Sequence, residues 1–286
     1  MNTIRTIKKT ISGQHAVDGA GVKLVREFGY HDTHDFDPFL LLDAFDSSNP
    51  QDYIKGFPWH PHRGIETVTY LIEGDIEHGD SLGNKGNILA GDCQWMTAGS
   101  GIIHQEMPQA MPRLLGAQLW INLPAKNKMT EPQYRSITKN EIPVIEEPNG
   151  TIRIVCGQYK DTRGATEGDF VKALYLDVEL KADRTWELET PNDHTLFIYI
   201  FRGEALFGEE NNKAVPEKHV ILFNEGNMFK VKALGNGIRF LLVSGPKLNE
   251  PIAWGGPIVM NTREELNQAF EELDNNSFIR HNIKMD

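Results

Sequence analysis

Two short stretches of the chain carry metal-binding side chains at the spacing of a β-strand. The first contains His60 and His62, and the second contains His104 and Glu106. Residues i and i+2 of a strand point to the same face, so each pair projects from one side of its strand. If both strands belong to one barrel, the four side chains can meet inside it. Three neutral imidazoles and a carboxylate suit a divalent transition metal.

A site of this kind would leave room for chemistry. Four protein ligands on an octahedral ion leave two open positions, for water, a bidentate substrate, or a substrate and dioxygen. The carboxylate can also act as a base. The chain has only two cysteines, Cys93 and Cys156, which excludes a disulfide scaffold and a thiolate zinc site. We therefore expect Fe(II), Mn, Ni, Cu or Co, and we interpret Cys93 as a buried structural thiol.

The His-x-His pair could also arise by chance, without binding a metal. Among ten histidines, one His-x-His arises by chance in roughly one case in three, so the pair alone is weak evidence. The order of the motifs, His-x-His followed by alternating strands and then Gly-x-Gly-x-x-His-x-Glu, favours a metal site. Glu66 has the same strand parity as His60 and His62, and parity cannot separate it from Glu106 as the carboxylate ligand. The acidic stretch from Glu73 to Asp80 is typical of a solvated hairpin.

The elements that must position these side chains are predicted to be strands. Short apolar runs alternate with turn signals about every ten residues, which is typical of an all-β sandwich or barrel. The clearest predicted strands cover residues 67–72, 114–123, 195–201 and 238–243. The two halves repeat a similar order of strands and glycine turns, which indicates an internal duplication.

The same pattern predicts the domain organisation. Residues 124–148 are rich in proline and polar residues, which is typical of a linker. We expect an N-terminal barrel over residues 1–130, a linker over 131–150 and a C-terminal barrel over 151–286. Near the end, Thr262 and Glu265 have the spacing of a capping box. Apolar residues follow at helical spacing, so we expect a short helix that packs against a barrel wall.

Composition excludes several classes of partner. The chain has 29 Lys and Arg residues against 40 Asp and Glu residues, a formal net charge of −11. Such an acidic surface repels phosphate backbones and anionic membranes, so direct binding to nucleic acid is not expected. No apolar stretch is long enough for a transmembrane helix, and the start of the sequence has no apolar signal core. We therefore expect a cytoplasmic protein.

The histidine motifs resemble those of the cupins and, within them, the pirins. The first cupin motif has the form G-x(5)-H-x-H-x(3,4)-E-x(6)-G, which is approximated here by Gly56, His60, His62, Glu66 and Gly74. In this chain Gly56 lies two residues too close to the first histidine. The second motif, P-x-G-x-x-H, is approximated by Gly99, Gly101 and His104. Four segments are specifically pirin-like and together extend over most of the chain: 57–68, 91–108, 118–124 and 256–262.

The resemblance implies a bicupin, with two jelly-roll-like barrels and one metal in the N-terminal barrel. Carried over by motif, the ligands are His60, His62, His104 and Glu106, with Fe(II) as the expected metal. Glu66 then becomes a residue that orients a ligand or supports the structure. We expect the second barrel to be metal-free, because the C-terminal half has no His-x-His.

The resemblance also implies an activity. The expected function is a dioxygenase that cleaves a flavonol such as quercetin with O₂, with Glu106 taking the hydroxyl proton of the substrate. The alternative is a metal- or redox-responsive regulator that acts through a protein partner. A third possibility is a small-molecule-binding cupin whose metal is incidental. Because two tethered barrels can bury the surfaces that single barrels bury by dimerising, a monomer is expected.

Overall fold

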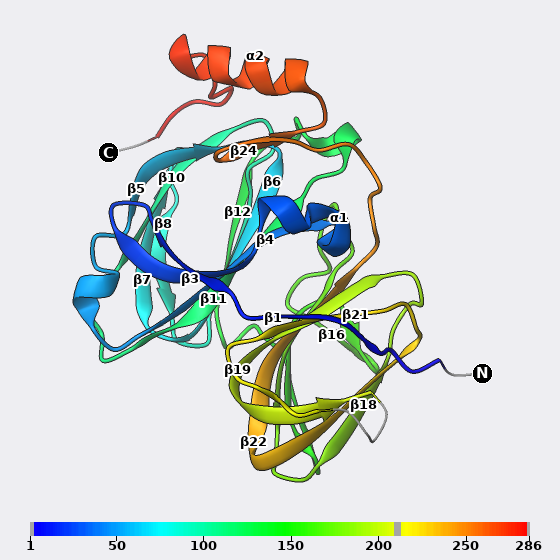
Figure 1. The fold of residues 1–286 in the computed structure, drawn as a ribbon. Helices are drawn as coiled ribbons and strands as arrows, with labels where there is room; N and C mark the ends of the chain where they lie inside the picture. The colour runs from blue at the N-terminus through cyan, green and yellow to red at the C-terminus, as the bar shows by residue number, and fades with distance from the viewer. Residues whose placement is uncertain (1–2, 209–212, 285–286) are drawn as a thin grey trace. The chain divides into compact units, whose positions relative to one another are not determined.

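The computed structural model describes residues 3–208 and 213–284, and most of these residues lie in β-strands (Figure 1). The chain divides into two compact units. Unit 1 consists of Met1–Gly13, His34–Pro38 and Asn140–Lys247, and unit 2 consists of Gln14–Thr33, Phe39–Lys139 and Leu248–Asp286. The predicted all-β architecture with a short C-terminal helix is confirmed.

This division differs from the boundaries expected from the sequence. Residues 3–13 belong to unit 1 and residues 248–284 to unit 2, in each case the unit opposite to the one expected. The expected linker over 131–150 contains strands. These strands are β12 (Gln133–Ile137), in unit 2, and β13 (Val144–Glu147), in unit 1. Each lies at the edge of its sheet. Edge strands tolerate polar residues and nearby prolines, which explains why this segment has the composition of a linker.

Unit 2 is a jelly-roll-like barrel with a larger and a smaller sheet. Across the larger sheet the order is β12, β9 (Cys93–Thr97), β6 (Ile65–Glu73), β11 (Leu114–Asn122), β4 (Phe39–Ser47), β3 (Val22–Phe28) and β2 (Gln14–Asp18). Across the smaller sheet it is β5 (Phe57–His62), β10 (Ile102–Pro108), β7 (Asp75–Asp80) and β8 (Lys85–Leu89). The remaining elements of this unit are η1 (Tyr30–Asp32), η2 (Pro50–Asp52), η3 (Ala125–Asn127), β23 (Ala253–Gly255), β24 (Ile258–Met260) and α2 (Arg263–Asp274).

Strand β10 shows how the sequence presents polar side chains to the interior of unit 2. Its residues alternate strictly between buried and half-buried, the pattern of a strand with one face turned inward. His104 and Glu106 are on the buried face. The inner face of this strand therefore carries an imidazole and a carboxylate among apolar neighbours.

Helix α2 begins where the sequence predicts. The hydroxyl of Thr262 accepts a hydrogen bond from the backbone N–H of Glu265 at 3.1 Å, and the Glu265 carboxylate accepts one from the backbone N–H of Thr262 at 3.0 Å. These two bonds form the capping box. Leu266 and Ala269 are buried against β24 and Phe278, so the helix packs on its own unit, as predicted.

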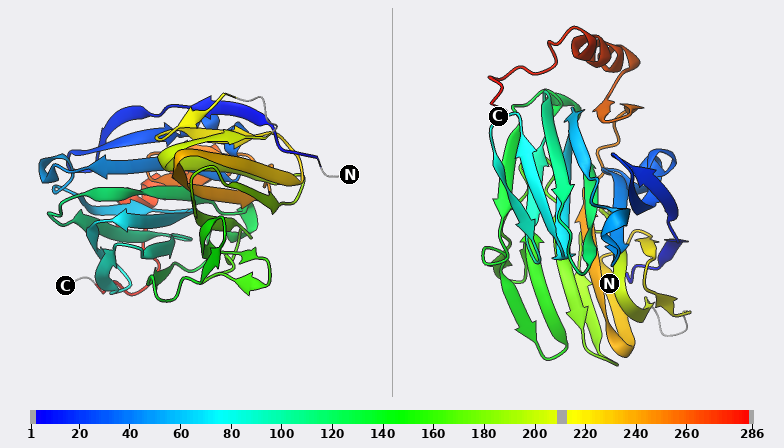
Figure 2. Two further views of the ribbon diagram at one scale, coloured as in Figure 1. Left: turned by 90° about the horizontal axis from the view of Figure 1, so that it is seen from below. Right: turned by 90° about the vertical axis from the view of Figure 1, so that its left-hand side faces the viewer.

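Unit 1 is built on one sheet of nine strands. Its main path runs β1 (Ile7–Ile11), β21 (Val220–Phe223), β19 (Thr195–Phe207), β22 (Met228–Gly245), β17 (Leu174–Leu180), β14 (Gly150–Cys156) and β13. The other elements are β15 (Gln158–Tyr159), β16 (Thr162–Arg163), β18 (Thr185–Glu189), β20 (Val215–Pro216) and α1 (Thr33–Phe36). In α1, Thr33 belongs to unit 2 and the residues from His34 onward belong to unit 1. The long strand β22 stands out in gold in both views of Figure 2.

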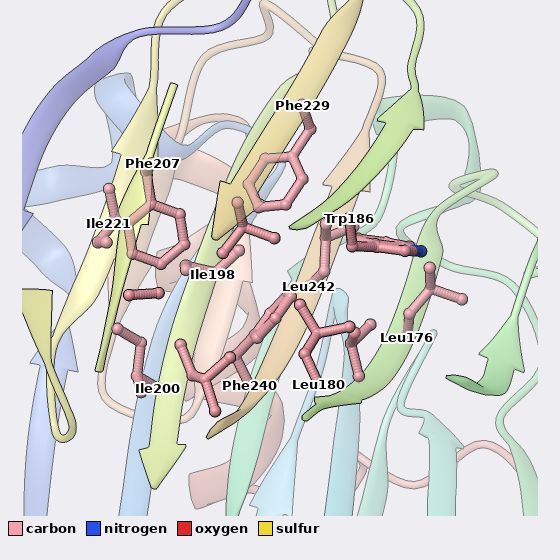
Figure 3. Packing of buried hydrophobic residues seen from close by; sticks show 14 of the residues in the cluster. Leu176, Leu180, Trp186, Ile198, Ile200, Phe207, Ile221, Phe229, Phe240 and Leu242 are labelled. Carbon is pink, nitrogen blue, oxygen red and sulfur yellow. The ribbon is translucent and has the colours of Figure 1, made fainter. Parts of the chain in front are cut away.

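Apolar side chains fill the interior of unit 1 (Figure 3). Trp186, Phe229 and Phe240 are mutually in ring contact, with centroids 6.0 to 6.2 Å apart. The interior of unit 1 is thus a packed apolar core.

One predicted strand is longer than expected. The sequence predicts a strand over residues 195–201, but β19 continues to Phe207, with a shift of register at Gly203. Gly203 has φ +83°, and a Cβ there would lie 2.1 Å from the carbonyl oxygen of Gly237. The glycine therefore marks a β-bulge with a close backbone approach, which has the same sequence signal as a turn.

Candidate metal centre

Three histidines come together on the smaller sheet of unit 2. His60 and His62 lie on β5, and His104 lies directly opposite His60 on β10. Directly opposed residues of an antiparallel pair share a face. The ring centroids are 4.4 Å apart for His60 and His104, 4.8 Å for His60 and His62, and 5.0 Å for His62 and His104. One ring nitrogen from each histidine lies within 4.8 Å of the others, a spacing suited to a shared ion.

Two of the imidazoles are held with a lone pair available for a metal. The Nδ1 atom of His60 lies 2.8 Å from the carbonyl oxygen of Pro58, and that of His62 lies 3.1 Å from the carbonyl oxygen of Pro257. A carbonyl can only accept, so Nδ1 carries the proton in both rings. The lone pair then resides on Nε2. Metal-binding histidines are commonly oriented by this kind of hydrogen bond.

The surroundings of the third imidazole, His104, show whether a metal ion fits this site. His104 is fully buried, and neither of its ring nitrogens has a hydrogen-bond partner among the described residues. An unpaired buried polar atom costs free energy, so such an atom calls for an explanation. An ion bound to one of these nitrogens would satisfy it. The residues present therefore fit a divalent metal.

The surroundings of His62 and His104 keep both of these rings neutral. Burial, with a smaller contribution from His60, lowers the pKa of His62 from 6.5 to about 3, although the Pro257 carbonyl opposes the shift. Burial, followed by the neighbouring histidines, also lowers the pKa of His104 well below its ordinary value. Neutral imidazole is the form that binds metals, so the site is ready to bind at neutral pH.

This shift predicts how the metal-free protein responds to acid. Between pH 6.5 and about 3 the unfolded chain protonates His62 while the folded chain does not. Protons then favour the unfolded state, so the free energy of unfolding should fall as the pH drops through this window. Denaturant unfolding of metal-free protein at several pH values would measure the slope. His62→Gln should reduce the slope, and an equal slope in both proteins would contradict the assignment.

Glu106 lies on the same strand as His104 but is held by a hydrogen-bond network of its own. Its carboxylate accepts from the Gln118 amide at 2.8 and 3.1 Å and from the Thr69 hydroxyl at 3.1 Å. Trp120 donates in turn to the Gln118 side-chain oxygen at 3.2 Å. Glu106 is buried, and it is not part of the group of three histidines that meets the metal spacing. A carboxylate has lone pairs to accept these bonds and also bind an ion.

The competing carboxylate, Glu66, lies on a different strand from the histidines. We assumed that Glu66 shares the strand of His60 and His62, and this is wrong. Strand β5 ends at His62, and β6 begins at Ile65 after a turn at Gly64. The turn breaks the period of two on which the parity argument depends. Glu66 is buried and accepts a hydrogen bond from the Thr97 hydroxyl at 2.7 Å.

The acidic stretch after β6 is not a solvated hairpin. It forms β7, in which His78 and Asp80 are both buried. His78 lies opposite Glu106 on the neighbouring strand and stacks on Tyr134, with ring centroids 4.3 Å apart. Its Nε2 atom lies 3.2 Å from Asp80. This second histidine group therefore borders the first, since the His78 and His104 rings are 5.7 Å apart.

The turn after His62 is fixed by the C-terminal segment. Gly64 has φ +77°, and a Cβ there would lie 1.9 Å from the carbonyl oxygen of Val259. Beside it, the buried Arg63 forms an ion pair with Glu272 at 2.7 Å and donates to the Phe278 carbonyl at 2.9 Å. These contacts hold β5 in place, and with it the two histidines.

Lys128 also holds the turn at Gly64 to the C-terminal segment, and its replacement should lower the free energy of unfolding. Its buried ammonium donates to the carbonyls of Gly64 and Val259, each at 2.8 Å, and to the side chain of Asn122. Lys128→Met leaves these acceptors buried without donors, at about 1–3 kcal/mol each. We expect the free energy of unfolding to fall by at least about 3 kcal/mol. Chemical denaturation would measure it, and the exposed Lys126→Met is the control. Equal stabilities of the two variants would contradict the role.

Sequence reasoning missed the residues that support the site. Gln118 interrupts the apolar run of β11, and that interruption was the available signal. Thr69 gives no such signal, because it is one of several polar residues on β6. The Pro257 carbonyl carries no such signal, because a backbone oxygen is present at every residue. Cys93 is buried, as expected. No helix within residues 3–208 or 213–284 has the length and apolar character that a membrane crossing requires.

Comparisons with known proteins match both halves of the chain. A family model described as Pirin matches residues 21–121, and one described as Pirin C-terminal cupin domain matches residues 175–279. A pirin-like protein of Caulobacter vibrioides is 40% identical over 278 residues, which cover 96% of this chain and 99% of the relative. A pirin-like protein of Solanum lycopersicum is 38% identical over 281 residues, covering 96% and 94%.

A solved structure agrees with these matches. The crystal structure of quercetin 2,3-dioxygenase from Acinetobacter baumannii superimposes with a TM-score of 0.87 at 32% sequence identity. The match covers 96% of this chain and 99% of that chain. The expected arrangement of two tandem cupin barrels is therefore confirmed.

Proposed function

Because this chain belongs to the pirin family, we propose that it is a metal-dependent dioxygenase that cleaves a flavonol such as quercetin with O₂. One observation carries the proposal. Three buried or half-buried imidazoles converge, two of them with the Nε2 lone pair available, and a buried carboxylate lies on the strand of the third. The likeness to the quercetin 2,3-dioxygenase of Acinetobacter baumannii supports the choice of substrate.

The metal would be held by His60, His62 and His104, with Glu106 as the fourth ligand. We propose Fe(II), with Mn, Ni, Cu and Co as ions that the same donors accept. A divalent ion bound here supplies Lewis acidity, which makes a coordinated substrate hydroxyl easier to deprotonate. Burial of the rings keeps water away from the reacting atoms and strengthens the electrostatic interactions around them.

Glu106 takes the hydroxyl proton of the flavonol. It is the base because it is the carboxylate on the histidine strand, and because Gln118 and Thr69 hold it in a fixed orientation. Both partners donate to the carboxylate oxygens and leave it no freedom to rotate. The deprotonated flavonol is richer in electrons than the phenol and reacts more readily with O₂. Ring cleavage follows when both oxygen atoms are added to the substrate.

Oxygen uptake tests this function directly. The protein is purified without oxygen, its metal content is measured by elemental analysis, and quercetin is then added in air-saturated buffer. We expect the Fe(II)-loaded protein to consume O₂ as quercetin disappears, and a chelator-treated sample to consume none. Protein with full iron content that leaves both O₂ and quercetin unchanged would overturn the proposal.

A further inference from the structure

A row of aromatic rings leads from the metal centre to the surface of unit 2. The ring centroids of His62 and Trp120 are 5.0 Å apart, those of Trp120 and Trp254 are 5.8 Å apart, and those of Trp254 and Tyr30 are 5.6 Å apart. The rings come from β5, β11, β23 and η1. Each separation lies in the range of direct aromatic contact. The row is therefore continuous from a proposed metal ligand to Tyr30.

The row also runs from the interior to the solvent. His62 is 3% exposed and Tyr30 is 61% exposed, while the two tryptophans are half-buried. The tryptophans are fixed by hydrogen bonds from their indole N–H groups. Trp120 donates to the side-chain oxygen of Gln118 at 3.2 Å, and Trp254 donates to the carbonyl oxygen of Gly256 at 2.8 Å. The contacts thus belong to oriented rings with one exposed end.

Indole and phenol are among the most easily oxidised side chains, and electron transfer between rings in contact is fast because tunnelling weakens steeply with distance. We propose that His62, Trp120, Trp254 and Tyr30 form a path for single electrons between the metal centre and the protein surface. Its function is protective, since it removes an oxidising equivalent from the centre before that equivalent attacks the histidines. The proposal rests on a redox-active metal at the three histidines and does not require the flavonol activity.

The reaction that the path completes can be written with hydrogen peroxide as the oxidant. Peroxide takes up two electrons and two protons and becomes two molecules of water. A ferrous ion held by the three histidines would supply one electron and be left ferric. The other comes from Tyr30 through the two tryptophans, and Tyr30 is left as a neutral tyrosyl radical. One proton is the phenolic proton of Tyr30, which passes to water, and the other comes from the solvent.

Tyr30 is a better end point than Tyr134, a second tyrosine whose ring connects to the centre. Tyr134 connects to His104 through the stacked ring of His78. Burial, followed by Asp80 and Glu106, raises the pKa of Tyr134, so its phenolic proton is held more tightly. The phenol of Tyr30 lies in solvent and can lose its proton to water. An exposed radical can also be reduced by small molecules in solution.

The test uses iron-loaded protein, a limiting amount of hydrogen peroxide and no flavonol. Rapid freezing and electron paramagnetic resonance detect the radical, and peptide mass spectrometry locates the oxidised residues. We expect a tyrosyl signal and oxidation at Tyr30 in the wild-type protein. Zinc-loaded protein, which has the same ligands but no accessible redox change, gives the background.

Two variants interrupt the row without touching the proposed ligands. In Trp254→Phe, the harder-to-oxidise ring should lower Tyr30 oxidation to the zinc background and raise oxidation of His60, His62 and His104. In Tyr30→Phe, a change at an exposed residue, the tyrosyl signal should disappear. Equal iron content and equal thermal unfolding confirm that the variants are comparable.

Three outcomes would overturn the path. These are Tyr30 oxidation unchanged in Trp254→Phe, oxidation of the wild-type protein centred on Tyr134, or no tyrosyl signal in a protein with full iron content. Because no quercetin is present, failure here leaves the dioxygenase untouched. Conversely, a protein that fails in the oxygen-uptake assay can still show the radical.

Discussion

Replacing His62 with alanine is expected to abolish metal binding and, with it, oxygen uptake. The variant removes one of the three converging imidazoles and leaves His60 and His104. Loss of a group that merely supports a metal ligand already costs about 10–100-fold in affinity, so loss of a ligand should cost more than about 100-fold. Elemental analysis after anaerobic purification, followed by titration with Fe(II), measures this directly.

The matched control is His15→Ala. His15 is an exposed histidine on β2 of the same unit, so its removal tests for non-specific loss of histidine. We expect this variant to bind metal as the wild-type protein does. Unfolding of both variants in the metal-free state shows whether the fold is preserved. If His62→Ala bound as much metal as His15→Ala, with equal affinity, the centre would lie elsewhere.

The common face of His60 and His62 could be predicted because it depends on local geometry. His60 and His62 are two residues apart on one strand, and the period of two fixes their common face whatever the rest of the fold does. That β10 pairs with β5 is not a local property, and it was supplied by the resemblance to a known family. The capping box of α2 was equally predictable, because both of its hydrogen bonds join Thr262 and Glu265.

The support of the centre could not be predicted, because it comes from distant parts of the chain. The Pro257 carbonyl that orients His62 is 195 residues away in sequence, and the Phe278 carbonyl that binds Arg63 is 215 residues away. Neither contact leaves a periodic or compositional trace. Both come from the C-terminal segment, which the sequence assigns to the second barrel and the structure assigns to unit 2.

Charged residues misled the sequence interpretation where the structure buries them in pairs. The stretch that contains His78 and Asp80 has the composition of an exposed turn. In the structure the two side chains lie 3.2 Å apart, and Asp80 also accepts hydrogen bonds from Asn84. The hydrogen bonds of Asp80, including the one with the Nε2 atom of His78, offset the cost of burying its carboxylate, so polarity alone does not report exposure here.

Glu106→Gln is expected to separate turnover from metal binding. The three imidazoles remain, and the amide oxygen can still contribute to binding, so the variant should keep part of its metal. An amide cannot take up the substrate proton, and loss of a general base costs about 10²–10⁴-fold in rate. Oxygen uptake with quercetin, normalised to measured iron content, gives the turnover per occupied site.

Glu66→Gln is the control that separates the two buried carboxylates. It makes the same chemical change at a carboxylate that accepts a hydrogen bond from Thr97 and lies on β6. If Glu106 is the base, Glu66→Gln keeps most of its turnover per iron while Glu106→Gln loses it. If Glu66 is the base, the two results exchange. Full turnover in Glu106→Gln would mean that Glu106 is not the base. Its hydrogen bonds with Gln118 and Thr69 would then have a purely structural role, since they need only an oxygen acceptor, which the amide retains.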